Sequence, residues 1–185
     1  MKRYLRDYGL LLGVAGIVIL LDQWTKALVR DSLPIGGTWM PWDWLRPYAR
    51  IVHWYNSGAA FGLFQNGALV FTILAILVAG LILYYFPRTS PQDWTLRLAM
   101  GLQLGGALGN LIDRLTMNGQ VTDFISIGAF PVFNVADASI TVGVCVLLLG
   151  AWLKEKKEKG AEEQESKETG EQGGRGAEEQ VSRGE

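Results

Sequence analysis

Two aspartates are candidates for chemistry because the chain around them is apolar. Asp123 lies in VTDFI and Asp137 lies in FNVADASI, with a short apolar link between them. A close pair of carboxyl groups shares one proton, because two like charges do not both ionise at short range, and their pKa values separate. One group then acts as a base toward water while the other acts as an acid. If the link folds back, the pair predicts aspartyl-protease chemistry.

Other hydrolytic chemistries have weaker support in the sequence. There is one histidine, His53, one cysteine, Cys145, and no HExxH pattern, which does not suit a zinc site of the usual kind. A serine mechanism using Ser57 with Lys26 or His53 lacks a GxSxG or SxxK pattern. We therefore expect His53 and Cys145 to be structural, and we expect neither a metal nor a cofactor.

The charged residues divide the chain into two parts. Residues 154–185 hold 17 charged side chains, whereas residues 1–153 hold 18, with eight Asp and no Glu. Residues 154–185 are rich in Glu, Lys, Gly and Gln, and their few apolar side chains bury too little surface to offset chain entropy. We predict a domain at 1–153 and a disordered, charged tail at 154–185. The net charge of −1 averages two unlike parts and predicts nothing about partners.

Four apolar segments indicate membrane helices. They cover residues 8–21, 67–87, 98–112 and 138–153. Crossing ~30 Å of hydrocarbon at 1.5 Å per residue takes about 20 residues. Only the second segment has that length unaided, so each of the others must take in the charged residues that bound it. We therefore predict an all-α membrane protein with a bundle of four transmembrane helices.

Basic residues predict the orientation of these helices. They precede the first segment, flank the connection between the second and third, and follow the fourth: Lys2, Arg3, Arg6, Arg88, Arg97, Lys154, Lys156, Lys157 and Lys159. By the positive-inside rule all three regions are cytoplasmic, and so are both termini. Arg46 and Arg50, in the first outer loop, argue against this orientation but are outnumbered.

This topology gathers the acids at one side of the membrane. Asp22, Asp113 and Asp137 all fall at the extracytoplasmic ends of their helices. Carboxylates within the apolar layer cost roughly 2.5 to 3.5 kcal/mol on insertion scales, so such acids are candidates for function. The alternative is that they lie at headgroup depth and pair with Lys26, Arg30 or Arg114 only to anchor helix ends.

Further polar residues adjoin these acids. Asn110 and Arg114 share a helix face with Asp113, after a run of glycines that lets a neighbouring helix approach closely. Asn134 and Asp137 open the fourth segment, and helix capping is the alternative role for either. Residues 116–140 form an apolar link, and we expect it to dock onto the membrane surface through Val121, Phe124, Ile125 and Ile127.

Five motifs in order resemble those of the lipoprotein signal peptidases, also called type II signal peptidases. They are LDQWTK, NSGAAFG, GGALGNLIDR, VTDFI and FNVADASI, and the resemblance spans residues 8–153. It implies an intramembrane aspartyl endopeptidase that needs no metal. Its substrates would be diacylglyceryl-modified bacterial prolipoproteins, cut just before the lipidated cysteine. VTDFI departs from the family's pattern only at Thr122, where Val is common.

The resemblance also implies roles for individual residues. Asp123 and Asp137 would be the catalytic pair. The residues lining the substrate site would be Asn56, Gly58, Asn110, Arg114 and Asn134, supported by Asp22, Lys26 and Asp113. The tryptophan-rich outer loop, residues 38–62, would form a short β-containing region with a movable element over the substrate. The alternative for its tryptophans is an aromatic belt at the membrane interface.

The resemblance implies a multi-pass protein of the bacterial cytoplasmic (inner) membrane, with its active site near the extracytoplasmic face. We expect it to be monomeric, to contact membrane lipids and to bind no nucleic acid. Two other classes stay open: a small ion-coupled transporter using the acids as a relay, and a scaffold presenting the charged tail. A cleaved signal peptide at residues 8–21 is a further alternative, but no small-x-small cleavage site follows it.

Overall fold

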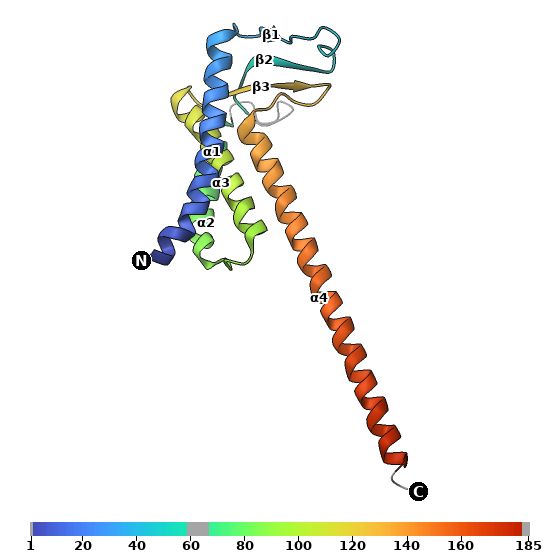
Figure 1. The fold of residues 1–185 in the computed structure, drawn as a ribbon. Helices are drawn as coiled ribbons and strands as arrows, with labels where there is room; N and C mark the ends of the chain where they lie inside the picture. The colour runs from blue at the N-terminus through green and yellow to red at the C-terminus, as the bar shows by residue number, and fades with distance from the viewer. Residues whose placement is uncertain (1, 59–66, 183–185) are drawn as a thin grey trace. The chain divides into compact units, whose positions relative to one another are not determined.

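The computed structural model describes residues 2–58 and 67–182, and side chains within 8–58 and 67–160. Helices and a small sheet follow one another along the chain (Figure 1). In order they are α1 (Lys2–Ser32), β1 (Thr38–Trp39), β2 (Ala49–Asn56), α2 (Ala68–Tyr85), the 3-10 turn η2 (Phe86–Arg88), α3 (Trp94–Thr116), β3 (Val121–Ile127) and α4 (Val135–Ser182). The chain divides into two compact units, Met1–Leu147 and Leu148–Glu185. The sheet, the core and the candidate site all belong to the first unit.

Three helices in the described part of the chain are long and apolar enough to cross a membrane. The spans are Tyr8–Ser32, Ala68–Arg88 and Val135–Gly160. α3 is not among them, because its buried residues include Arg97, Asn110 and Asp113. The sequence therefore predicted the four long helices correctly, whereas a membrane-spanning role for α3 stays a prediction.

Glycines on α3 set how closely α1 approaches it. A Cβ on Gly101 would lie 2.9 Å from the Val14 side chain, and one on Gly105 would lie 2.6 Å from that of Val18. These glycines are one helical turn apart, so they form a stripe along which α1 packs against backbone. The contact holds the polar ends of α1 and α3 side by side.

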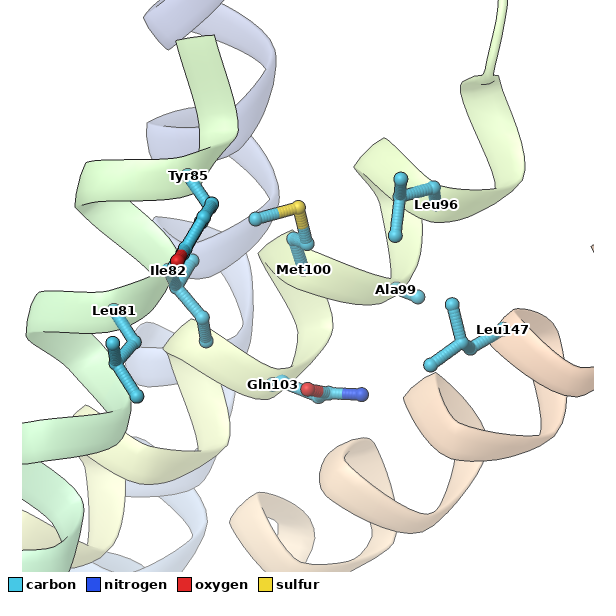
Figure 2. A pocket seen from close by; sticks show the side chains of 8 residues that line it. All are labelled: Leu81, Ile82, Tyr85, Leu96, Ala99, Met100, Gln103 and Leu147. Carbon is cyan, nitrogen blue, oxygen red and sulfur yellow. The ribbon is translucent and has the colours of Figure 1, made fainter. Parts of the chain in front are cut away.

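A second close contact joins α3 to α4. A Cβ on Gly106 would lie 2.5 Å from the Ala136 carbonyl oxygen, in the first turn of α4. Further along, a Cβ on Gly143 would lie 3.1 Å from Cγ of Gln103. Beside this contact is a cavity of about 210 Å³, lined by apolar side chains from α2, α3 and α4 with Gln103 at its edge (Figure 2).

The apolar core of the bundle is small, and many large apolar side chains face outward. Leu11, Ile82, Phe86 and Leu104 are buried together with Ala15 and Ala79. On α1, α2 and α4, leucines, isoleucines and valines are widely exposed. A bundle surrounded by hydrocarbon has this distribution, because lipid tails solvate apolar side chains as well as a protein core does.

The three strands form one antiparallel sheet in the order β1-β2-β3. It lies at the end of the bundle where α1 ends and α4 begins (Figure 1). The turn from α3 into β3 uses two positive φ angles, 52° at Asn118 and 85° at Gly119, residue types that tolerate them. The predicted β-containing region is thus present, and it includes residues 121–127.

The structure differs from the expected docking of residues 121–127 onto the membrane surface. Val121 and Phe124 are each only 4% exposed, whereas Ile127 is 49% exposed. Successive side chains of a strand point to opposite faces, and β3 is covered on both. Apolar composition indicated burial but could not distinguish a lipid surface from the protein's own helices.

The last helix extends past the predicted boundary between domain and tail, and the disorder of the tail stays a prediction. In the structure α4 continues to Ser182, beyond the predicted boundary at residue 154. At the start of this segment Lys159 pairs with Glu155 at 2.6 Å, one helical turn apart. Such Glu and Lys pairs stabilise helices by a few tenths of a kcal/mol each, which composition alone does not weigh.

Candidate active site

The two candidate acids come from neighbouring elements and share one partner, Asn134. Asp123 lies in the middle of β3, and Asp137 lies in the first turn of α4. The Asn134 side chain donates from Nδ2 to Oδ1 of Asp123 at 2.7 Å, and its backbone N–H donates to Oδ2 of Asp137 at 3.2 Å. Oδ1 of Asn134 accepts the backbone N–H of Asp137 at 2.9 Å, which is the predicted helix cap. One asparagine therefore caps α4 and also bridges the two acids.

Asn110 on α3 holds Asp137 from the other side. Its Nδ2 donates to Oδ1 of Asp137 at 2.7 Å. Its Oδ1 accepts from Nζ of Lys26 at 2.9 Å and from Nδ2 of Asn134 at 3.0 Å. An ammonium group only donates, so the oxygen of this amide must face Lys26 and the NH₂ group must face the acid. The orientation of Asn110 follows from Lys26.

Asn56 at the end of β2 holds Asp123. Its Nδ2 donates to Oδ2 of Asp123 at 3.0 Å, while its Oδ1 accepts the backbone N–H of Gly58 at 2.9 Å. The second bond is an Asx-type turn that fixes the asparagine side chain. Residues 59–62 of the NSGAAFG motif, and with them part of the predicted movable element, lie outside the described residues.

The environment of Asp123 favours its protonated form. Burial and then the negative charge of Asp137 raise the pKa of the Asp123 carboxyl to about 7. The hydrogen bonds from Asn56 and Asn134 and the charge of Lys26 act in the opposite direction but do not outweigh burial. Near neutral pH this carboxyl can therefore both hold and release a proton, as an acid catalyst must.

Both acids line a cavity of about 770 Å³. Its polar lining is Asn56, Asn110, Arg114, Asp123, Asp137 and Thr141, and the other lining residues are apolar apart from Gly58. The guanidinium of Arg114 lies 5.6 Å from the ring centre of Phe71, a residue of α2 that also lines the cavity. A large apolar cavity with a few convergent polar groups is the usual form of a binding site.

The three predicted supporting residues form a buried charge cluster behind the acids. Nζ of Lys26 lies 2.8 Å from Oδ2 of Asp22 and 3.3 Å from Oδ2 of Asp113, and all three side chains are almost fully buried. Oδ1 of Asp22 accepts the backbone N–H of Ala136 at 2.9 Å, and Oδ2 of Asp113 accepts that of Thr122 at 2.8 Å. The cluster thus attaches to the residue preceding each candidate acid.

Sequence reasoning missed Gln23 in this cluster and considered Arg30 only as an alternative partner that anchors helix ends. Gln23 donates from Nε2 to Oδ1 of Asp113 at 3.1 Å and to the Gly109 carbonyl at 3.0 Å. Arg30 donates from Nη1 to Oγ1 of Thr122 at 3.0 Å. Arg30 follows Lys26 by one helical turn, so it lies on the same face of α1, and this spacing was the available signal.

Several other reactive residues lie apart from the acids. Nδ1 of His53 lies 2.7 Å from the Leu33 carbonyl, its ring packs edge-on against Tyr55, and Nε2 is buried without a partner. Cys145 and Ser57 are exposed and do not line the cavity. Within the described ranges, no three His, Cys, Asp or Glu side chains cluster in a way that could hold a metal ion.

Comparisons with known proteins agree with this arrangement. Residues 14–153 match the family model described as signal peptidase (SPase) II. A lipoprotein signal peptidase of Anoxybacillus flavithermus is 38% identical over 151 residues, covering 80% of this chain and 88% of the relative. One from Moorella thermoacetica is 40% identical over 140 residues, covering 72% and 87%.

A solved structure extends the likeness to three dimensions. It is described as a bacterial membrane enzyme at 2.3 Å resolution, and it superposes with a TM-score of 0.72 at 32% sequence identity. The match covers 80% of this chain and 90% of the other. The region that matches the family model, residues 14–153, includes both candidate acids.

Proposed function

The chain belongs to the signal peptidase II family, a family of proteases, and we propose that Asp123 and Asp137 are the pair with which it hydrolyses its substrate. That substrate is a bacterial prolipoprotein, from which the enzyme removes the signal peptide. The observation that carries the assignment is the bridge through Asn134, which bonds to both acids. No other pair of ionisable side chains lining the described cavity has such a bridge.

The hydrogen bonds suggest different roles for the two acids. Asp137 accepts hydrogen bonds from Asn110 and from a backbone N–H, with the Lys26 cation behind Asn110, and each of these contacts stabilises the carboxylate form that a base requires. Asp123 has a pKa raised to about 7 and holds the shared proton. Asp137 is therefore the general base and Asp123 the general acid.

The reaction then proceeds by addition and elimination. Asp137 takes a proton from a water between the acids, and the water oxygen bonds to the scissile carbonyl carbon. Asp123 gives its proton to the carbonyl oxygen as the C=O double bond becomes a single bond. When the tetrahedral intermediate collapses, the C–N bond breaks and the leaving nitrogen receives the proton held by Asp137. Asp123 regains its proton from the intermediate, and the initial protonation state is restored.

The shape of the cavity supports a lipidated substrate cut before its modified cysteine. Its apolar walls come from α2, α4 and the segment joining β3 to α4, and include Phe71, Phe130, Ile140 and Val142. These side chains can pack against acyl chains, while Asn56, Gly58, Asn110 and Arg114 offer polar atoms to the peptide. Asn134, which was also predicted to line the substrate site, is fully buried and does not line the cavity, so we assign it the bridging of the two acids. We infer that a single protomer suffices, since these groups come from one chain, and that membrane lipids surround it.

The topology we propose for this multi-pass bacterial membrane protein has four crossings and both termini in the cytoplasm. α3 then crosses the membrane with its polar side chains covered by α1 and α4, which reconciles its polarity with a bilayer. The sheet and the acids lie near the extracytoplasmic face. The basic residues of both ends and of the α2–α3 connection support this orientation.

Cleavage of a diacylglyceryl-modified prolipoprotein, followed by gel shift, tests the assignment. Asp123→Asn and Asp137→Asn should each lose detectable cleavage while keeping the fold, because neither amide can exchange the proton that the reaction requires. Asp43→Asn is the matched control, because the Asp43 side chain is 95% exposed and does not line the cavity. Full turnover by either variant of the pair would exclude it as the catalytic dyad.

A further inference from the structure

Thr122, the residue before Asp123, links β3 to the helices through hydrogen bonds. It is fully buried and bonds through three of its atoms. Its N–H donates to Oδ2 of Asp113 at 2.8 Å, its Oγ1 accepts from Nη1 of Arg30 at 3.0 Å, and its carbonyl accepts from Nδ2 of Asn134 at 3.4 Å. These partners come from α3, α1 and the residue preceding α4.

The hydroxyl and the neighbouring acid face opposite sides of the strand. Side chains alternate along a strand, so Thr122 points toward α1 while Asp123 points into the cavity. Nη1 of Arg30 also lies 3.7 Å from Oδ1 of Asp113, so the guanidinium sits between the strand and α3. A shift of Thr122 along this contact would carry Asp123 with it.

Pairing with β2 does not by itself fix the position of β3 relative to the helices. β3 pairs along its length with β2, and that pairing has an irregularity between Ile51 and Trp54, where Trp54 is opposite Asp123. The other acid is anchored separately, since the first turn of α4 is held by Asp22 and Asn110. Besides the Asn134 bridge, the spacing of the two acids therefore depends on where each element is attached to the helices, and for β3 one such attachment is Thr122.

We propose that Arg30 and Thr122 are positioning residues, whose hydrogen bond sets Asp123 at the distance from Asp137 that the reaction needs. The proposal rests on the function proposed above. Valine, which the family resemblance gives as common at this position, would fill the same space but offer no acceptor to Arg30, so we infer that the bond positions Asp123 in this chain in particular. Misplacement of a catalytic group by a fraction of an ångström to 1 Å lowers rates by up to about a hundredfold.

The test compares Thr122→Val with Thr122→Ser, which keeps the acceptor. For Thr122→Val we expect kcat to fall about tenfold with KM within about twofold, and for Thr122→Ser we expect kcat within about twofold of wild type. Thr116→Val is the matched control, because the Thr116 hydroxyl is exposed and bonds to carbonyls of its own helix. Its kcat should be unchanged.

The pH–rate profile separates positioning from mere loss of folded protein. A smaller folded fraction lowers the rate by the same factor at every pH. If Asp123 moves away from Asp137, their coupling weakens and the two apparent pKa values of the profile move closer together. We expect this narrowing in Thr122→Val and not in Thr122→Ser.

Two results would overturn the proposal: wild-type kcat in Thr122→Val, or a loss that is the same at every pH. If Thr122→Val does not fold, Arg30→Met removes the same bond from the other side, and unchanged kcat there is equally decisive. Arg30→Met and Thr122→Val combined should lose no more than the more severe single variant. Failure of the dyad itself is distinguishable, because it appears as turnover by Asp123→Asn, whatever Thr122→Val does.

Discussion

Replacing Asp123 by asparagine should remove a pH-dependent cost to stability from the folded protein. The pKa of this carboxyl is raised from its ordinary value of 3.8 to about 7 by burial and by Asp137. Between these two values the folded state binds more protons than the unfolded state, so stability falls as pH rises. The contribution is complete below about pH 4 and is lost as pH passes through about 7.

The size of the effect follows from the pKa. At about 1.4 kcal/mol per pH unit, the interval from 3.8 to about 7 corresponds to about 4 kcal/mol of unfolding free energy. The asparagine has its own cost, because Asn56 and Asn134 both donate to Asp123. The new NH₂ group must face one of these two donors, and no hydrogen bond forms there. That cost is about 1–3 kcal/mol and does not change with pH. The variant should therefore be less stable than wild type at low pH and more stable near pH 8, where about 4 exceeds about 1–3 kcal/mol.

Equilibrium unfolding in detergent micelles, followed by tryptophan fluorescence at a series of pH values, measures this difference. The wild-type and Asp123→Asn curves should cross between about pH 4 and pH 8. Asp43→Asn is again the control, and its curve should run parallel to wild type because that side chain is exposed. Parallel curves for Asp123→Asn would refute the reasoning, since burial would then not hold a proton on Asp123.

Three further predictions concern the parts that support the site. Gly106→Ala should cost about 1–3 kcal/mol of stability and most of the activity, because its Cβ would lie 2.5 Å from the Ala136 carbonyl oxygen and displace the first turn of α4. Gly80→Ala, with nothing within 4 Å of the added atom, should leave both unchanged or slightly raise stability, and thermal unfolding with a cleavage assay checks the two together. Lys26→Met should destabilise the protein by about 3–5 kcal/mol, because it leaves the buried Asp22 carboxylate without its cation and Asp113 with only the more distant Arg30, and unfolding at neutral pH measures this. Deleting residues 154–185 should leave cleavage nearly unchanged, and a complete loss would favour the scaffold hypothesis.

The helices could be predicted from the sequence, but their ends could not. The first apolar run stops at residue 21, whereas α1 continues to Ser32. It continues because Asp22 and Lys26 pair on one face and are covered by α3, so charges that end an apolar run do not end the helix. The length of the apolar run predicted that the helix takes in these charges, but it carries no information on the partner that buries them.

The candidate site could be predicted as a set of residues but not as a geometry. The motifs indicated Asp123, Asp137 and the polar residues around them, and the structure brings these together at one cavity. That Asn134 bridges both acids depends on how β3 lies against α4, and no local pattern encodes it. The role of Thr122 was missed for the same reason, since its partners Arg30 and Asp113 are distant in sequence.

The pairing of Asp22 with Lys26 has a consequence for how the protein enters the membrane. Both residues belong to α1 and lie one turn apart at 2.8 Å, so this helix pairs these two charges within itself. α1 can therefore partition into lipid with these charges already paired and need not wait for α3. When α3 packs beside it, Asp113 meets a cation that α1 already holds in place.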